Sequence, residues 1–129
     1  MRIMNRILKT TMFLLILVTT SCYYDNEEKL YPVLSKDCNL TDVTFSGTIK
    51  PILQATCFSC HSNSNYLNSG GGIKLENYAD IKIMAGNGKL MGAVKHDSGY
   101  IPMPQGGGKL SDCEISQLQK WIDNGTLNN

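Results

Sequence analysis

The chain has 129 residues, of which 42% are hydrophobic and 18% are charged, with a formal net charge of +1. This length provides for one domain. Beyond the first 21 residues, nine lysines stand against eleven acidic residues, a net charge of −2, and the lysines are dispersed. This distribution excludes a basic patch of the kind that binds nucleic acid, so no nucleic-acid partner is expected.

Residues 1–21 have the layout of a secretory signal. Three basic side chains precede an apolar run at residues 11–18, and this run is too short for a transmembrane helix, which needs about 20 apolar residues. Small residues stand directly before Cys22, a pattern that resembles the lipobox of bacterial lipoproteins. The resemblance implies that residues 1–21 are removed and that Cys22 carries a lipid. The alternative is an ordinary signal peptide with an incidental cysteine.

Residues 22–37 are polar, which predicts a tether between the membrane and a folded domain at residues 38–129. A lipid anchor holds a water-soluble domain at a membrane surface. We therefore expect an exported protein that is lipid-anchored to a bacterial membrane and faces the periplasm or the cell surface.

The folded part is predicted to be all-α, with long loops. Apolar periodicity and turn residues indicate helices at residues 47–57, 78–84, 90–95 and 112–124. Pro51 lacks an N–H and belongs in the first turn of a helix, so the first of these begins no earlier than about Gly47. Segments rich in Gly, Asn or Pro at 62–72 and 99–109 predict loops, and the alternation at 73–76 predicts at most a short extended piece.

The last helix has the clearest local signals. Ser111 and Glu114 form a capping box at its start, and Gly125 is the residue type that follows a helix end. Between them an apolar stripe runs along one face, with a tryptophan beside it. Another turn signal, Asn87-Gly88, separates the two middle helices.

The motif Cys57-Phe58-Ser59-Cys60-His61 ends the first predicted helix. Two cysteines three positions apart on a helical turn point the same way, and in an exported chain this spacing before a histidine is typical of covalent haem c attachment. The motif occurs once, so one haem is expected. A thioredoxin-type redox pair is an alternative that needs a βαβ context. The other alternative is zinc, held by Cys57, Cys60, His61 and His96.

These assignments account for all five cysteines. Cys22 is assigned to the lipid, and Cys57 and Cys60 are assigned to the haem. The two cysteines that remain are Cys38 and Cys113. Export permits disulfides, so we expect these two residues to pair. The pair would close a loop of about 75 residues and contribute roughly 4.5 kcal/mol through chain entropy. The alternative is two separate buried thiols.

A sixth ligand to the iron decides whether the haem transfers electrons or binds external molecules. A methionine or a second histidine occupies the coordination position that an external molecule would need. Met84 and Met91 fall at helical apolar positions, where core packing explains them, and His96 lies in a polar stretch. Met103 stands between two prolines in a glycine-rich loop, where packing does not explain it. We therefore expect His61 and Met103 as the axial ligands, and the alternatives are His96 in place of Met103 or an iron without a second protein ligand.

Residues 42–127 resemble a class I cytochrome c. The resemblance rests on three segments: Ile49-x-x-Ile52-Leu53-x-x-x-Cys57-x-x-Cys60-His61, Met103-Pro104-x-Gly106-Gly107 and Leu110-Ser111-x-x-Glu114-Ile115-x-x-Leu118-x-x-Trp121-Ile122-x-x-Gly125. It implies three to five short helices around one covalently bound haem, with Met103 as the distal ligand. It also implies that the first and last helices cross, with Leu53, Leu118 and Trp121 at the contact.

The same resemblance implies an electron carrier rather than an enzyme, which exchanges single electrons with redox protein partners and takes no small-molecule substrate. Two alternatives stay open. One is a gas- or peroxide-binding haem domain that acts as a sensor or weak peroxidase, and the other is a haem subunit of a larger oxidoreductase complex. The glycine-rich loop after His61 and the Cys38/Cys113 pair depart from the family pattern without touching the haem residues.

Overall fold

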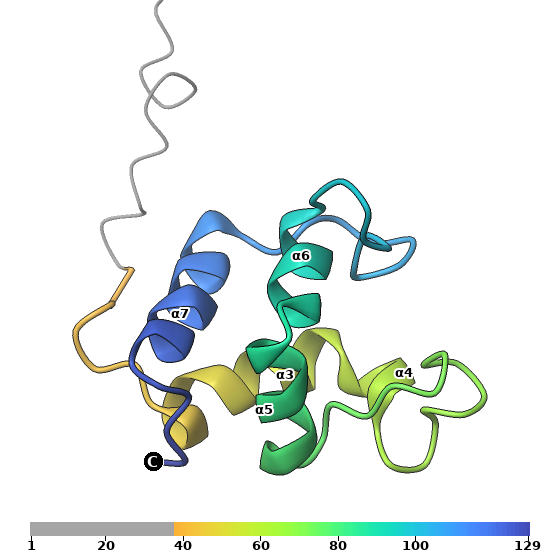
Figure 1. Cartoon of the computed structure of the whole chain (residues 1–129), viewed down its shortest axis with the longest axis horizontal. Coiled ribbons are helices and arrows are strands. Elements are labelled where there is room, and N and C mark those ends of the chain that lie inside the picture. Colours follow the sequence, from red (N-terminus) through yellow and green to blue (C-terminus); the bar gives the residue numbers. More distant parts are fainter. Residues whose placement is uncertain (1–37) are drawn as a thin grey trace, which may run out of the picture. The chain divides into compact units, whose positions relative to one another are not determined.

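The computed structural model describes residues 38–129, and this part of the chain is helical without strands (Figure 1). Its elements are η1 (Phe45–Ile49), α3 (Lys50–Thr56), α4 (Phe58–His61), α5 (Tyr78–Gly86), α6 (Lys89–Lys95) and α7 (Asp112–Asp123). The predicted all-α class is confirmed for this part. None of these helices is long and apolar enough to cross a membrane. The predicted signal peptide, the lipidation site Cys22 and the tether lie outside the described residues.

The first helix begins earlier than the sequence predicts. A single π-helical turn, η1, starts at Phe45, and the side chain of Thr44 caps it by accepting a hydrogen bond from the Gly47 N–H (3.1 Å). Pro51 then lies in the first turn of α3. The first turn is a position where a proline, which lacks an N–H, is tolerated in a helix. The predicted start near Gly47 was therefore two residues too late.

The middle of the chain follows its turn signals. α5 and α6 extend the predicted helices by two residues and one residue, and the predicted turn lies between them, where Gly88 has a φ of 78°. The predicted loops at 62–72 and 99–109 contain no helix or strand, and residues 73–75 are irregular.

The last helix, α7, has the predicted boundaries to within one residue. The Ser111 hydroxyl accepts a hydrogen bond from the Glu114 N–H (3.3 Å), and the Glu114 carboxylate accepts one from the Ser111 N–H (2.9 Å). Gly125 follows the helix with a φ of 89°. The predicted capping box and stop signal are both confirmed.

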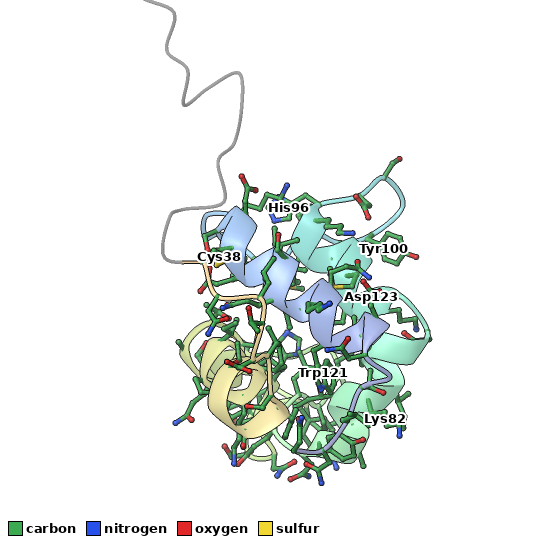
Figure 2. The ribbon with its side chains drawn as sticks, turned by 90° about the vertical axis from the view of Figure 1, so that its left-hand side faces the viewer. Cys38, Lys82, His96, Tyr100, Trp121 and Asp123 are labelled. Atoms are coloured by element: carbon green, nitrogen blue, oxygen red, sulfur yellow. A yellow bond between two sulfur atoms is a disulfide. The ribbon has the colours of Figure 1, made fainter. Side chains whose placement is uncertain are left out.

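The core gathers side chains from η1, α3, α5, α6 and α7, with Trp121 of α7 among them (Figure 2). Trp121 is 1% exposed, and its ring centroid lies 5.6 Å from that of Phe45, which meets Tyr78 edge-on at 5.1 Å. Leu53 and Leu118 are fully buried in the same cluster. The first and last helical segments therefore pack together, and Phe45, which lies outside the predicted helix, makes the aromatic contact with α7.

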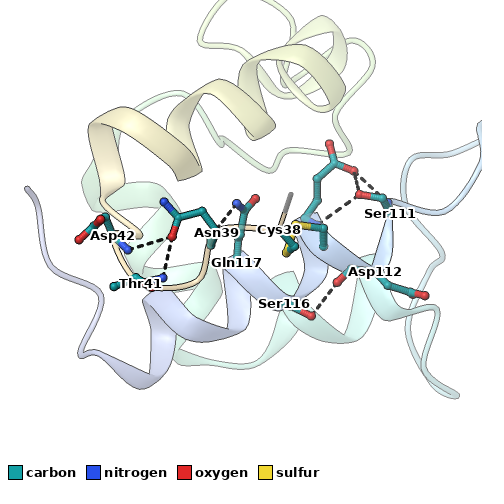
Figure 3. Close-up of a disulfide and its surroundings, with 10 residues drawn as sticks. Cys38, Asn39, Thr41, Asp42, Ser111, Asp112, Ser116 and Gln117 are labelled. Atoms are coloured by element: carbon teal, nitrogen blue, oxygen red, sulfur yellow. Dashed lines mark hydrogen bonds between the residues drawn. A yellow bond between two sulfur atoms is a disulfide. The ribbon is translucent and has the colours of Figure 1, made fainter. Parts of the chain in front are cut away.

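A disulfide between Cys38 and Cys113 attaches the segment before η1 to the first turn of α7 (Figure 3). The two Cα atoms are 5.6 Å apart, within the usual range for such bridges. Beside the disulfide, the Gln117 side-chain amide donates a hydrogen bond to the carbonyl oxygen of Asn39 (3.1 Å). The Asn39 side chain in turn accepts from the N–H groups two and three residues further on. Residues 38–42 are thus held along α7.

Candidate functional site

The cysteine motif occupies the junction of α3 and α4. Cys57 ends α3, and its carbonyl oxygen accepts hydrogen bonds from the N–H groups of Cys60 (3.2 Å) and His61 (2.9 Å). This single turn brings both cysteines and the histidine to the wall of one cavity. Cys57 is 8% exposed, Cys60 is half-buried, and neither is part of a disulfide. The turn therefore presents two thiols and an imidazole from five consecutive residues.

Burial raises the pKa of the Cys57 thiol, and a hydrogen bond with the Thr56 hydroxyl (3.3 Å between Oγ1 and Sγ) only partly offsets the rise. Desolvation disfavours the charged form, so the group stays a neutral thiol at neutral pH. A thioredoxin-type pair needs the opposite, a thiol whose pKa is lowered so that it attacks as a thiolate. The direction of the shift counts against that alternative, and residues 38–129 also lack the strands of a βαβ unit.

The ring of His61 is 8% exposed and is oriented by the loop that follows it. Its Nδ1 lies 3.0 Å from the carbonyl oxygen of Ile73, and its own carbonyl accepts a hydrogen bond from the Leu75 N–H (2.9 Å). Because a carbonyl oxygen only accepts, Nδ1 is the donor in this contact, and in the neutral imidazole the lone pair is then on Nε2. This is the tautomer in which a histidine binds a metal while its second nitrogen is held by the protein.

Gly70 lies tightly against the motif in this loop. A Cβ at this position would lie 2.7 Å from the Cys60 carbonyl oxygen and 3.0 Å from Nδ1 of His61. We expect Gly70→Ala to lower the free energy of unfolding by about 1–3 kcal/mol, because the new methyl group meets backbone atoms. Gly86→Ala is the matched control, since a Cβ there meets nothing within 4 Å. Equal denaturant midpoints for the two variants would contradict this expectation.

The cavity has a volume of about 440 Å³, and both cysteines, His61 and Met103 line it. Pockets of 300–1,000 Å³ with apolar walls and a few polar groups are typical sites for small molecules and cofactors. Much of the remaining lining is apolar and comes from α5, α6 and the residues after the glycine-rich loop, including Ile73, Leu75, Leu90 and Val94. The four residues predicted to hold a haem therefore border one space.

Met103 reaches the cavity from the loop between α6 and α7. Its N–H donates a hydrogen bond to the carbonyl oxygen of Ala93 (3.0 Å), and its carbonyl oxygen lies 3.0 Å from Nε2 of His96. Both contacts are made to the last turn of α6 and the residue that caps it. The methionine is thus attached through its backbone to α6, which packs against α5 and α7.

The other methionines considered as a sixth ligand, Met84 and Met91, differ in whether they line the cavity. Met91 is buried in the core and does not line the cavity. Met84, which the sequence assigns to core packing, is partly buried against the core but also lines the cavity. Its sulfur accepts a hydrogen bond from the Asn87 amide (3.8 Å). Two thioethers, those of Met84 and Met103, therefore border the space that His61 faces.

The zinc alternative requires His96 to join Cys57, Cys60 and His61. His96 is exposed and lies outside the cavity, with Nε2 directed at the carbonyl oxygen of Met103. Among residues 38–129, no group of three or more His, Cys, Asp and Glu side chains is arranged to hold a metal ion. The four residues of that alternative do not form one site.

Four parts of the site were not predicted from the sequence: the contact of the Ile73 carbonyl with His61, the close approach at Gly70, the position of Met84 at the cavity, and the packing of Tyr100 on α6. A Cβ on Gly92 would lie 2.5 Å from the Tyr100 ring, so this ring lies directly on α6, where it forms part of the cavity wall. The one sequence signal for this contact is the glycine inside a predicted helix, since such glycines often mark close approach.

Comparisons of the chain with protein-family models, with curated proteins and with solved structures found no match. The family resemblance of the three sequence segments stays a prediction, and so does the identity of a cofactor. The chemistry of the groups that line the cavity bears on function: two thiols, one imidazole of defined tautomer and two thioethers.

Proposed function

We propose that residues 38–129 form a class I cytochrome c domain that carries one covalent haem c and transfers single electrons. The observation that supports the proposal is the convergence of Cys57, Cys60, His61 and Met103 on one apolar cavity of about 440 Å³. These residues come from two segments separated by some 40 positions in the chain, and each is the residue type that such a haem requires.

The residues present fit a covalent haem. Cys57 and Cys60 would each add a thiol S–H across a haem vinyl group, which forms a C–S and a C–H bond and needs no oxidant. The neutral state of the Cys57 thiol is compatible with that addition. His61 would bind the iron through Nε2, because Nδ1 is committed to the Ile73 carbonyl. Met103, which lines the same cavity, would hold the iron through its thioether sulfur.

A haem held in this way supplies an iron that alternates between Fe(III) and Fe(II). The chain's own contribution would be to hold the iron through His61 and Met103, so that no substrate reaches the metal, and to limit the access of water with an apolar lining. A thioether ligand and burial favour the reduced state relative to ligation by two histidines. The proposed role is therefore a carrier without substrate chemistry.

Partners of this carrier would be redox proteins that approach the exposed side of the cavity. Ile101 is 67% exposed and borders the cavity, so an apolar contact surface adjoins the haem site. A lipid on Cys22 would keep the domain at a bacterial membrane, facing the periplasm or the cell surface. This arrangement suits a tethered carrier between membrane-bound redox complexes.

Covalent attachment provides the test of the proposal. Expressed with haem c attachment machinery, the wild-type protein should gain the mass of one haem and keep it after denaturation with acid and organic solvent. Cys57→Ala/Cys60→Ala should lose this mass entirely, because both thioether bonds are removed. Cys38→Ala/Cys113→Ala is the matched control and should retain it, since neither residue lines the cavity. A wild-type protein without covalent haem under these conditions would overturn the proposal.

A further inference from the structure

The loop that carries Met103 has few backbone attachments of its own. Pro102 and Pro104 on either side have no N–H to donate, and the sequence that follows is a run of three glycines. The Met103 N–H and carbonyl oxygen are the backbone groups through which this stretch is tied to α6, at Ala93 and His96. The direction of the thioether therefore depends on those two bonds.

His96 ends α6 in a conformation that is uncommon for its residue type. Its φ is 61° and its ψ 39°, the left-handed region in which glycine and asparagine usually end helices. Histidine is tolerated there better than most residues. From this position the imidazole reaches the carbonyl oxygen of Met103 (3.0 Å). Because that oxygen only accepts, Nε2 carries the proton and donates. A glycine would cap the helix equally well but would leave the carbonyl without this donor.

A methionine is a weak ligand to iron, so its binding depends on how well the protein holds it in place. When a loop must be ordered to present a ligand, every bond that orders it raises the fraction of molecules in which the ligand is bound. The Ala93 bond fixes one end of the Met103 backbone and the His96 bond fixes the other. His96 does not line the cavity, so an effect of its side chain on the iron would have to pass through Met103, whose carbonyl oxygen it contacts.

We propose that His96 is a positioning residue for Met103: its Nε2–H holds the Met103 carbonyl and so favours the loop conformation in which the thioether faces the haem site. The inference rests on the proposed function, because it requires Met103 to be the axial ligand. It assigns His96 a task that its sequence position, in a polar stretch after α6, does not suggest.

The test compares two amide side chains of different length. His96→Asn suits the left-handed backbone but is too short to reach the Met103 carbonyl, whereas His96→Gln keeps a donor at about the distance of Nε2. The probe is free imidazole, which competes with Met103 for the ferric iron of the haem-loaded, full-length protein. We expect His96→Asn to bind imidazole about threefold more tightly than wild type, the low end for one exposed hydrogen bond. His96→Gln should match wild type.

The outcomes separate the inference from the proposed function. If wild type shows the methionine-to-iron absorption band and His96→Asn binds imidazole with wild-type affinity, the positioning role of His96 is overturned while Met103 stays the ligand. If His96→Gln binds imidazole as tightly as His96→Asn does, loss of the hydrogen bond is not the cause of the tighter binding, and the inference also fails. A wild-type ferric protein without the band overturns Met103 as ligand, and the inference with it. The inference is supported if His96→Asn binds imidazole more tightly than wild type and His96→Gln does not.

Discussion

Met103→Leu should abolish the weak thioether-to-iron charge-transfer band of the ferric protein, whereas Met84→Leu should leave this band in place. Both methionines line the cavity, so geometry alone does not separate them as ligands. Met84 lies within α5, is partly buried against the core, and its sulfur is engaged by Asn87. Met103 lies on an irregular loop and is held by its backbone, with its sulfur free of such a contact in the described structure. These differences favour Met103.

Met103→Leu and Met84→Leu can be compared directly because both variants should fold. Leucine and methionine have similar volumes, and such exchanges usually cost less than about 1.5 kcal/mol. Absorption spectra of the ferric protein and its reduction potential would be measured for wild type and both variants. We expect the potential of Met103→Leu to fall, because a thioether ligand stabilises the reduced iron. Met84→Leu should stay near wild type in both measurements.

Two results would redirect the assignment. Loss of the band in Met84→Leu and its retention in Met103→Leu would make Met84 the ligand and would leave the electron-carrier proposal standing. A ferrous wild-type protein that binds carbon monoxide readily at neutral pH would contradict the carrier proposal, because an iron with two bound side chains resists such ligands. That result would favour the sensor or peroxidase alternative, and Met103→Leu would then bind carbon monoxide no faster than wild type.

The parts of the fold that the sequence predicted are those with local causes. The capping box of Ser111 and Glu114 and the stop at Gly125 act over a few residues, so α7 could be placed to within one position. The π turn at Phe45 was not predicted, because the apolar periodicity used to place helices does not distinguish a π turn from an irregular approach to the helix. The contact of Phe45 with Trp121 joins positions far apart in the chain and was missed with it.

In the candidate site, too, the parts with local causes could be predicted from the sequence, and the contacts between distant segments could not. The cysteines and the histidine of the motif are adjacent in sequence, so their common direction follows from one helical turn. The contacts that orient them are distant: Ile73 holds His61 across a loop, and α6 holds Met103. The acceptors in these bonds are backbone carbonyl groups, which every residue has, so the sequence does not show which carbonyl each donor meets. The presence of Met84 at the cavity could not be predicted for the related reason that an apolar helix position looks the same whether it faces core or cavity.

Removal of the disulfide should lower the stability of the domain by several kcal/mol without touching the haem motif. The bridge spans 75 positions of the chain and fixes residues 38–42 along α7 (Figure 3). A loop of this length corresponds to roughly 4.5 kcal/mol of chain entropy, and loss of a native disulfide from a small exported domain typically costs about 2–5 kcal/mol. We therefore expect Cys38→Ala/Cys113→Ala to lose about 2–4 kcal/mol in guanidinium unfolding. For a domain of this size, such a loss lowers the melting temperature by roughly 10 °C or more.

The matched control keeps the bridge and removes the contact beside it. Gln117→Ala deletes the bond to the Asn39 carbonyl, an exposed hydrogen bond, and should cost about 0.5–1 kcal/mol. Dithiothreitol should lower the stability of wild type to that of the double variant and should not affect the double variant itself. A double variant within about 1 kcal/mol of wild type would show that the bridge contributes no more than its neighbouring contact.

Because neither cysteine lines the cavity, the absorption spectrum of the folded double variant should stay unchanged. A changed spectrum would mean that the segment held along α7 supports the haem site as well as the fold.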